Sequence, residues 1–279
     1  MVNLLLYVFV CPCVAALLAT LPALIGAGRA IREKAPFVGI AVTVGYVAAH
    51  VGLVGPPRVP PGSPEHWLPL LSVAAVLVFL VRDFMATPVW FSMAARLFAV
   101  FGVLGIMLAP MVQTWTAESL LLWIGGTTLA VLIPWVSLDY LVPGDAEAPV
   151  VPAALAAVAA GGSVAVLLSG NPQVAQLIGG LAVVLGALCL FCHVSKGFRF
   201  GHAATATGVV TLLSLLLYAQ HRVDLPAASI LLLALGLGAA PVGRSVERST
   251  GSAFVGLVAT VLAALPAVGP AVFLSLPGS

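Results

Sequence analysis

The apolar stretch VAQLIGGLAVVLGALCLFCH, residues 174–193, decides the fold. It contains 20 residues and no Asp, Glu, Lys or Arg. A helix rises about 1.5 Å per residue, so about 20 apolar residues span the hydrocarbon core of a bilayer. The stretch therefore predicts a transmembrane helix.

The composition extends this prediction to the whole chain. Of its 279 residues, 62% are hydrophobic and only 7% are charged, and the mean hydropathy is +1.19. A soluble domain carries about 25% charged residues. With so few charges, most of the surface must face lipid rather than water. We therefore expect an integral membrane protein whose main partner is the lipid bilayer, in the cell (inner) membrane of a prokaryote.

Ten stretches of the chain are candidates to cross the membrane. They are 3–27, 36–54, 66–81, 88–110, 118–137, 150–169, 174–193, 203–219, 226–242 and 252–275. Because 66–81 is short and 88–110 contains Arg96, whether this pair crosses fully stays open. The connections are too short for another domain. We expect an all-α bundle of about ten transmembrane helices arranged as hairpins, with one domain over 1–279 and no soluble extramembrane domain.

The basic residues predict the orientation of the chain. Four of the five connections expected on one side are basic, and they hold Arg29, Arg32, Lys34, Arg82, Lys196, Arg199, Arg244 and Arg248. The fifth, between 118–137 and 150–169, is acidic, which this rule tolerates because Asp and Glu contribute little to orientation. The other connections hold only Arg58 and Arg222. Short loops rich in Lys and Arg stay in the cytoplasm, so both termini are expected on the outer side. Because the basic residues are dispersed, we expect no nucleic-acid partner.

Two segments of the chain are similar to each other. GRAIREKAPFVGIAVTV at 28–44 matches GRSVERSTGSAFVGLVATV at 243–261, with two extra residues in the second. Both join an odd-numbered predicted helix to an even-numbered one, so a true duplication favours hairpins of the same orientation. Inverted-repeat transporters instead match segments of opposite orientation. A chance match between Ala- and Val-rich segments is the alternative, and both stay open.

The end of the opening stretch, CLFCH at 189–193, has the spacing of a c-type haem attachment motif. Covalent attachment takes place on the outer side of the membrane, whereas Lys196 and Arg199 place this end inside. The sequence therefore disfavours covalent haem and predicts no cofactor. His193 and His202 stay weak candidates for a metal or a b-type haem.

A stripe of small residues gives this face of the helix a simpler explanation. It consists of Ala175, Gly179, Ala182, Gly186 and Cys189, at spacings that keep one helix face. Small residues let transmembrane helices approach closely. We expect the stripe to be a helix contact.

Arg96 is the main candidate for function, because a charge inside a membrane is costly and marks function. Its side chain is expected to reach the inner interface or to pair there with Asp83 or Asp139. The alternative is that Arg96 and Asp139 bind a substrate.

The absence of other motifs narrows the function. No predicted helix has a carboxylate at mid-span, which argues against a proton- or sodium-coupled transporter, and nucleotide-binding motifs are absent. We expect a non-catalytic subunit or scaffold of a membrane complex, with membrane-protein partners or as a homo-oligomer, and we favour no enzymatic activity. The alternatives are a permease for a small neutral or weakly polar solute and, with less support, a b-type haem electron carrier.

Overall fold

The computed structural model describes residues 6–25, 36–85, 87–109, 115–142, 149–194 and 199–276, and its regular elements are all helices. The N-terminal helix is a π-helix, η1 (Leu6–Val10), continued by α2 (Cys11–Ile25). The remaining helices are α4 (Pro36–Leu53), α5 (Pro64–Phe84), α6 (Val89–Leu108), α7 (Ala117–Leu141), α8 (Val150–Leu168), α9 (Pro172–Val194), α10 (His202–Val223), α11 (Ala227–Gly236), α12 (Ala239–Thr250) and α13 (Ala253–Phe273).

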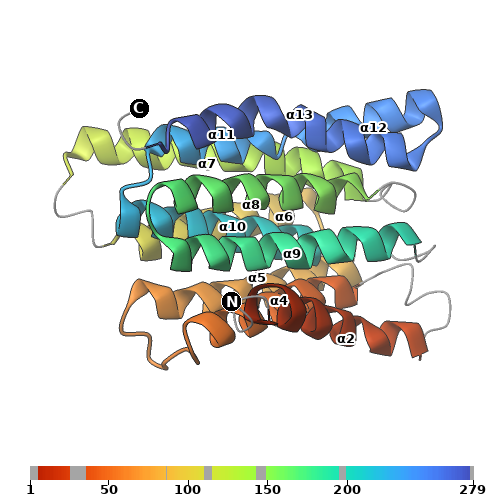
Figure 1. The fold of residues 1–279 in the computed structure, drawn as a ribbon, viewed down its shortest axis with the longest axis horizontal. Coiled ribbons are helices and arrows are strands. Elements are labelled where there is room, and N and C mark those ends of the chain that lie inside the picture. The colour runs from red at the N-terminus through yellow and green to blue at the C-terminus, as the bar shows by residue number, and fades with distance from the viewer. Residues whose placement is uncertain are drawn as a thin grey trace.

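Eight of the described helices are long and apolar enough to cross a membrane, with α11 and α12 taken together. The first two predicted crossings correspond to shorter apolar helices, Leu6–Leu21 and Phe37–Leu53. These lengths and compositions confirm the all-helical architecture and indicate an integral, multi-pass membrane protein. The helices run side by side, and the described connections lie at the two ends of the bundle (Figure 1).

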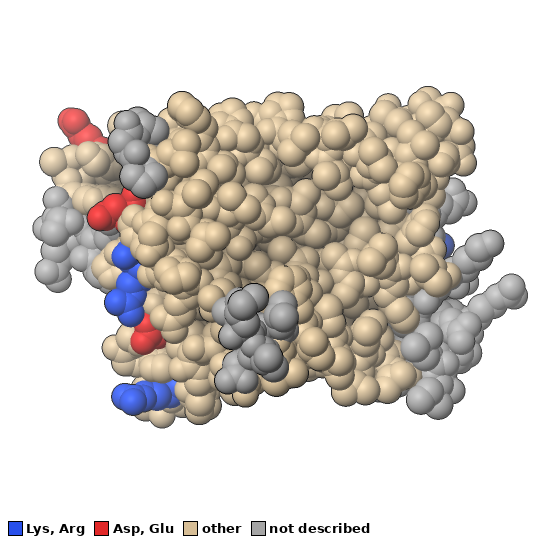
Figure 2. Space-filling view, viewed as in Figure 1, with Lys and Arg blue, Asp and Glu red and all other residues tan. Residues whose placement is uncertain are grey.

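On the face shown in Figure 2, the charged side chains lie mainly at the left end, a little blue shows at the right edge, and the described residues of the broad middle carry no charge. One end, called the Arg82 end here, holds the α5–α6, α9–α10 and α12–α13 connections. The other, called the Arg222 end, holds the α4–α5, α8–α9 and α10–α11 connections. This separation agrees with an uncharged belt in contact with lipid.

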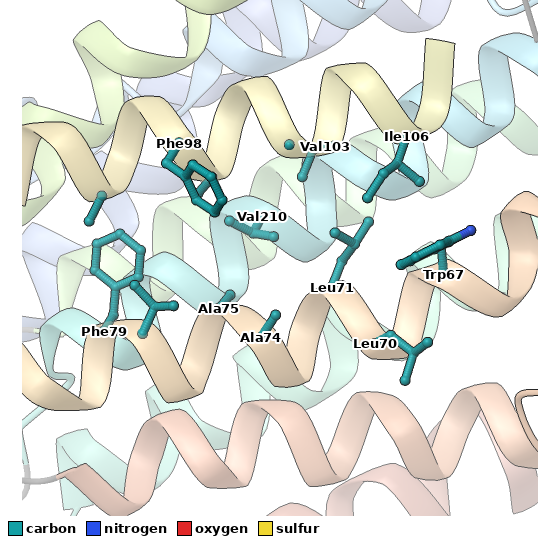
Figure 3. Close-up of a pocket in the computed structure, with 14 residues that line it drawn as sticks. Trp67, Leu70, Leu71, Ala74, Ala75, Phe79, Phe98, Val103, Ile106 and Val210 are labelled. Carbon is teal, nitrogen blue, oxygen red and sulfur yellow. The ribbon is translucent and has the colours of Figure 1, made fainter. Parts of the chain in front are cut away.

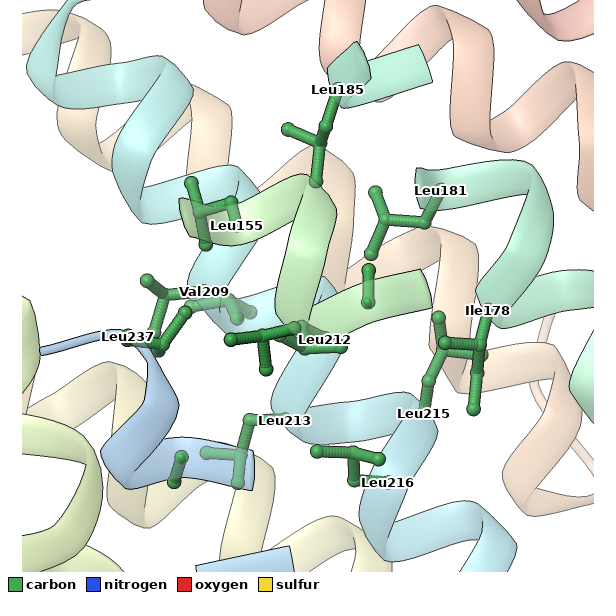
Figure 4. Close-up of a cluster of buried hydrophobic side chains, with 14 of the residues drawn as sticks. Leu155, Ile178, Leu181, Leu185, Val209, Leu212, Leu213, Leu215, Leu216 and Leu237 are labelled. Atoms are coloured by element: carbon green, nitrogen blue, oxygen red, sulfur yellow. The ribbon is translucent and has the colours of Figure 1, made fainter. Parts of the chain in front are cut away.

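Helix α10 forms the centre of the bundle. In its most apolar 18-residue window, 94% of the residues are buried, although α10 has the lowest mean hydropathy of the eight candidate spans. Lipid solvates apolar side chains, so the least apolar helix is the one that the others enclose. Leucines and valines of α8, α9 and α10 fill the core around it, among them Leu155, Leu181 and Leu212 (Figure 4).

Three pairs of helices that follow each other in sequence pack extensively on each other. Helix α4 packs along α2, α9 along α8, and α13 along α12. Helix α5 makes its most extensive contact with α10 rather than with its neighbour α6. A single enclosed helix thus organises the middle of the chain, because α4, α5, α6, α7, α8, α9 and α11 all pack on α10.

The segment GRSVERST at 243–250 is helical, whereas its polar sequence predicts a connection. Helix α11 ends at Gly236, and α12 continues from Ala239 after a short turn. An ion pair between Arg244 and Glu247 stabilises α12, and Gly251, with a φ of +66°, ends it in the left-handed region that glycine adopts without strain. Two of the basic residues at the Arg82 end, Arg244 and Arg248, therefore lie on a helix rather than in a loop.

The two similar segments place corresponding glycines at close helix contacts. The first copy is described only from residue 36 onward, and Gly39 there corresponds to Gly256 in the second copy. A Cβ atom on Gly39 would lie 2.9 Å from Cβ of Ala203 in α10, and one on Gly256 would lie 2.7 Å from Cβ of Glu247 in α12. In both segments the glycine therefore permits a close contact between helices, although the helix that it contacts differs.

We expect Gly39→Val to destabilise the bundle by about 1–3 kcal/mol, because the new side chain would overlap Ala203 and the backbone of α10. Thermal unfolding of the purified protein in detergent measures this. Gly102→Val in α6 is the matched control, because a Cβ there meets no atom within 4 Å. Equal unfolding temperatures for both variants would show that α4 and α10 are not closely packed at Gly39.

Candidate functional site

The Arg82 end contains an ionic cluster around Asp139, near the end of α7. This side chain is 2% exposed, and its Oδ2 accepts a hydrogen bond of 2.9 Å from Nε of Arg96 in α6. A second bond from Nη2 of Arg96 reaches the same oxygen. The pairing of Arg96 with Asp139 is one of those expected from the sequence. Both side chains are buried, and a buried charge without a partner would strongly destabilise the fold. The ion pair therefore neutralises the charge of Arg96 and that of Asp139.

Two further groups contact the same carboxylate. Nη1 of Arg82 in α5 donates to Oδ2 of Asp139 at 2.8 Å, and Nδ1 of His202 in α10 lies 3.3 Å from Oδ1. Arg82 also donates to the hydroxyl of Ser92 in α6. The cluster therefore joins α5, α6, α7 and α10 at one end of the bundle.

Asp83 has a different partner from the one considered in the sequence. Its carboxylate accepts hydrogen bonds from the backbone N–H groups of His202 at 2.9 Å and Ala203 at 3.0 Å, at the start of α10. A helix N-terminus has unpaired N–H groups and a partial positive charge, and both favour a carboxylate. The residue before the helix is Gly201, where a Cβ would lie 2.7 Å from Oδ2 of Asp83. A residue of α5 therefore caps α10, and glycine leaves the room for it.

The predicted histidine pair is not brought together by any contact in the described residues. His202 is held by Asp139, whereas Nδ1 of His193 is buried without a hydrogen-bond partner. The described part of the chain holds no group of three or more His, Cys, Asp or Glu side chains suited to a metal. A haem or metal role for His193 stays a prediction.

The small-residue stripe of α9 lies partly against α8. Ser163 of α8 donates to the carbonyl of Ala175 at 2.7 Å, and a Cβ on Gly179 would lie 3.2 Å from the same hydroxyl. Cys189 donates to the carbonyl of Pro149, just before α8, at 3.6 Å. At Gly186 the stripe opens into an apolar groove of about 490 Å³ that α13 completes.

Another apolar cavity, of about 350 Å³, lies between α5 and α6 with α10 behind it (Figure 3). Its wall includes Trp67, Phe98 and Val210, and Figure 3 shows almost only carbon atoms around it. Such a lining offers almost no hydrogen bond to a polar solute. This cavity and the groove at Gly186 suit apolar occupants.

A polar cavity lies at the Arg222 end, and no sequence pattern predicts it. It encloses about 390 Å³ and is lined by Val54, Glu65, Asn171, Gln173, Val174, Leu177, Tyr218 and Arg222. Oε2 of Glu65 accepts hydrogen bonds from the Tyr218 hydroxyl at 2.8 Å and from Nη2 of Arg222 at 2.7 Å. Nε of Arg222 donates to the Tyr218 oxygen at 3.0 Å. The three side chains form a closed polar triad from α5 and α10.

Two buried polar side chains of α4 lie near this triad. Tyr46 and His50 are fully buried with their ring centroids 6.2 Å apart, and neither has a hydrogen-bond partner. Their helix, α4, packs against both α5 and α10, which carry the triad. Unpaired buried polar groups are costly, so their presence beside a polar cavity needs an explanation.

A polar face of α10 runs from this cavity into the bundle. Thr207, Thr211, Ser214 and Tyr218 follow at steps of four, three and four residues, so they share one side of the helix. The hydroxyls of Thr207 and Thr211 are buried without a partner, as is that of Ser72 on the adjoining α5. The interior beside α10 thus contains buried hydroxyl groups that no hydrogen bond satisfies.

Comparison of the chain with protein-family models, curated proteins and solved structures gave no match. Its function therefore has to be inferred from these residues themselves.

We expect Asp139→Asn to destabilise the protein by about 3–5 kcal/mol, because it leaves the guanidinium of Arg96 buried without a counter-charge. Thermal unfolding in detergent checks this, with Glu118→Gln as the control, since Glu118 is an exposed carboxylate on the same helix. If Asp139→Asn unfolds at the temperature of the native protein, the cluster does not hold the four helices together.

Proposed function

We propose that the protein is a permease for a small polar solute without net charge, and that the cavity at the Arg222 end is its solute site. The observation that carries this proposal is the combination of a polar cavity with unpaired buried hydroxyls on the helix behind it. In a membrane interior, polar groups are retained at a cost where they line a pathway. Thr207 and Thr211 would provide hydrogen bonds to a passing solute or to water.

The Arg82 end fits the closed side of such a pathway. None of the cavities described above reaches Arg96, and Arg82 and Arg96 are both bonded to Asp139. A solute leaving at this end would have to separate α10 from helices tied by the ionic cluster. The geometry therefore corresponds to a permease open at the Arg222 end and closed at the Arg82 end.

A membrane-complex subunit is the second candidate, although the sequence alone favours it over a permease. That preference depends on a near-absence of buried ionisable groups, whereas the structure buries Arg96, Asp139 and Glu247. It keeps one supporting observation, the groove beside Gly186, whose wall includes Ala153, Ala156 and Ala157. Such a floor of small residues would accept a transmembrane helix of another subunit.

We further propose ten crossings with both termini on the outer side, in the cell membrane of a prokaryote. The basic residues of the described Arg82 end, together with Arg29, Arg32, Lys34 and Lys196 in the sequence, support a cytoplasmic location for it. The Arg222 end, with the polar cavity, then faces outward.

Labelling of single cysteines tests this orientation. Arg58→Cys and Thr250→Cys, each with the four native cysteines replaced by alanine, introduce one thiol at an exposed position of the Arg222 end and of the Arg82 end. A membrane-impermeant maleimide should label the first in intact cells and the second only after permeabilisation. The reverse pattern would invert the proposed topology.

Accessibility of the polar face of α10 tests the permease. In the same cysteine-free background, we expect Thr211→Cys to react with a charged, water-soluble thiol reagent in native membranes, because transport opens this face to water. Leu122→Cys is the control, since this position on α7 is exposed on the outside of the bundle, away from α10. If Thr211→Cys reacts no faster than Leu122→Cys, the pathway along α10 does not exist.

A further inference from the structure

We infer that the cavity at the Arg222 end binds a zwitterion of the amino-acid type, with one carboxylate and one ammonium group. This inference rests on the proposed permease and names its substrate class. It starts from the two opposite charges that line one small cavity, Glu65 and Arg222.

Both charged groups remain available to a ligand. The side chains of Glu65 and Arg222 are 25% and 51% exposed. A guanidinium has five N–H groups, and Arg222 uses Nε for Tyr218 and Nη2 for Glu65, so further donors remain. A carboxylate accepts about four hydrogen bonds, and those from Tyr218 and Arg222 both end on Oε2. Each group can therefore add a ligand bond without first breaking the pair.

The balance of charge selects against ions of a single sign. Glu65 and Arg222 together carry no net charge, and their atoms lie 2.7 Å apart. A lone anion drawn to Arg222 would lie beside the carboxylate of Glu65, and a lone cation would lie beside Arg222. Like charges in a partly enclosed site repel more strongly than in water. A zwitterion avoids both repulsions, because its carboxylate faces the guanidinium while its ammonium faces the carboxylate.

The aromatic ring of Tyr218 fixes the direction of this pair. The guanidinium carbon of Arg222 lies 5.6 Å from the ring centroid, and the Tyr218 hydroxyl contacts both Glu65 and Arg222. Cation–π contact and the shared hydroxyl restrict the rotamers of a long side chain. The two charges are thus presented at a set separation, which is what recognition of two charges on one small molecule requires.

The rest of the lining completes a site for a molecule of this class. Asn171 and Gln173 contribute side-chain amides, which both donate and accept hydrogen bonds. Val54, Val174 and Leu177 contribute an apolar wall on which an aliphatic side chain would pack. The volume of about 390 Å³ lies within the range of small-molecule sites.

Binding of matched probes to the purified full chain tests the inference. The zwitterions are L-alanine and L-leucine, and the single-charge analogues of leucine are 4-methylpentanoate and 3-methylbutylamine. Isothermal titration calorimetry should detect L-leucine and neither analogue. If an analogue binds as tightly as L-leucine, or if neither zwitterion binds, the inference is wrong.

Charge-removing variants then assign the binding to this cavity. Arg222→Gln and Glu65→Gln should each weaken the binding of the zwitterion about tenfold or more, because one of its charges loses its partner. Arg58→Gln and Glu118→Gln are matched controls, since both remove exposed charges at the same end outside the cavity. Unchanged affinity in both cavity variants, with native unfolding temperatures, would overturn the assignment. If a cavity variant does not fold, the probe series on the native chain decides.

Uptake into proteoliposomes separates this inference from the proposed function. Binding of L-leucine without uptake would support the zwitterion site and overturn the permease. Uptake of a neutral polyol such as glycerol, without binding of either amino acid, would support the permease and overturn the zwitterion site.

Discussion

The carboxylate of Asp139 is the contact on which the arrangement of the helices depends. Lipid tails are as apolar as leucine, so burial of apolar surface does not by itself bring transmembrane helices together. Asp139 of α7 instead accepts bonds from Arg82 of α5 and Arg96 of α6 and contacts His202 of α10. Helices α5, α6 and α7 share only modest contacts in sequence order, so this polar junction fixes their positions around α10.

Helix α10 connects the two polar regions of the molecule. Its 22 residues correspond to a length of about 33 Å at about 1.5 Å per residue. His202 at its start belongs to the ionic cluster, and Tyr218 and Arg222 near its end line the polar cavity. A helix with this pattern is unfavourable against lipid at either end and along its threonine face. Its enclosure by the more apolar helices therefore both completes the fold and places the candidate sites.

The sequence predicts the helices well because each depends on a run of neighbouring apolar residues. It predicts the sites poorly because each site combines residues that are far apart in the sequence. The stretch 203–219 anticipates α10, and the cost of a membrane charge directs attention to Arg96. The segment 243–250 is missed because its polarity suggests a connection, although an ion pair and a glycine cap make it helical. The polar cavity is missed because Glu65, Asn171 and Arg222 are more than 50 residues apart in sequence. Only the packing of α5 and α9 on α10 brings them together.

The cap that Asp83 provides for α10 has a consequence for motion. Helices α5 and α10 are antiparallel and are bonded at both ends, by Asp83 to the backbone of His202 and Ala203, and by Glu65 to Tyr218 and Arg222. Because the two helices are bonded at both ends, neither can slide along the other or tilt away from it while these bonds hold. Any motion of α5 relative to α10 would therefore have to break bonds at one end of the pair or at the other. Helices α6 and α7 are joined to this pair through Asp139, so moving them away from it would break the bonds of that carboxylate.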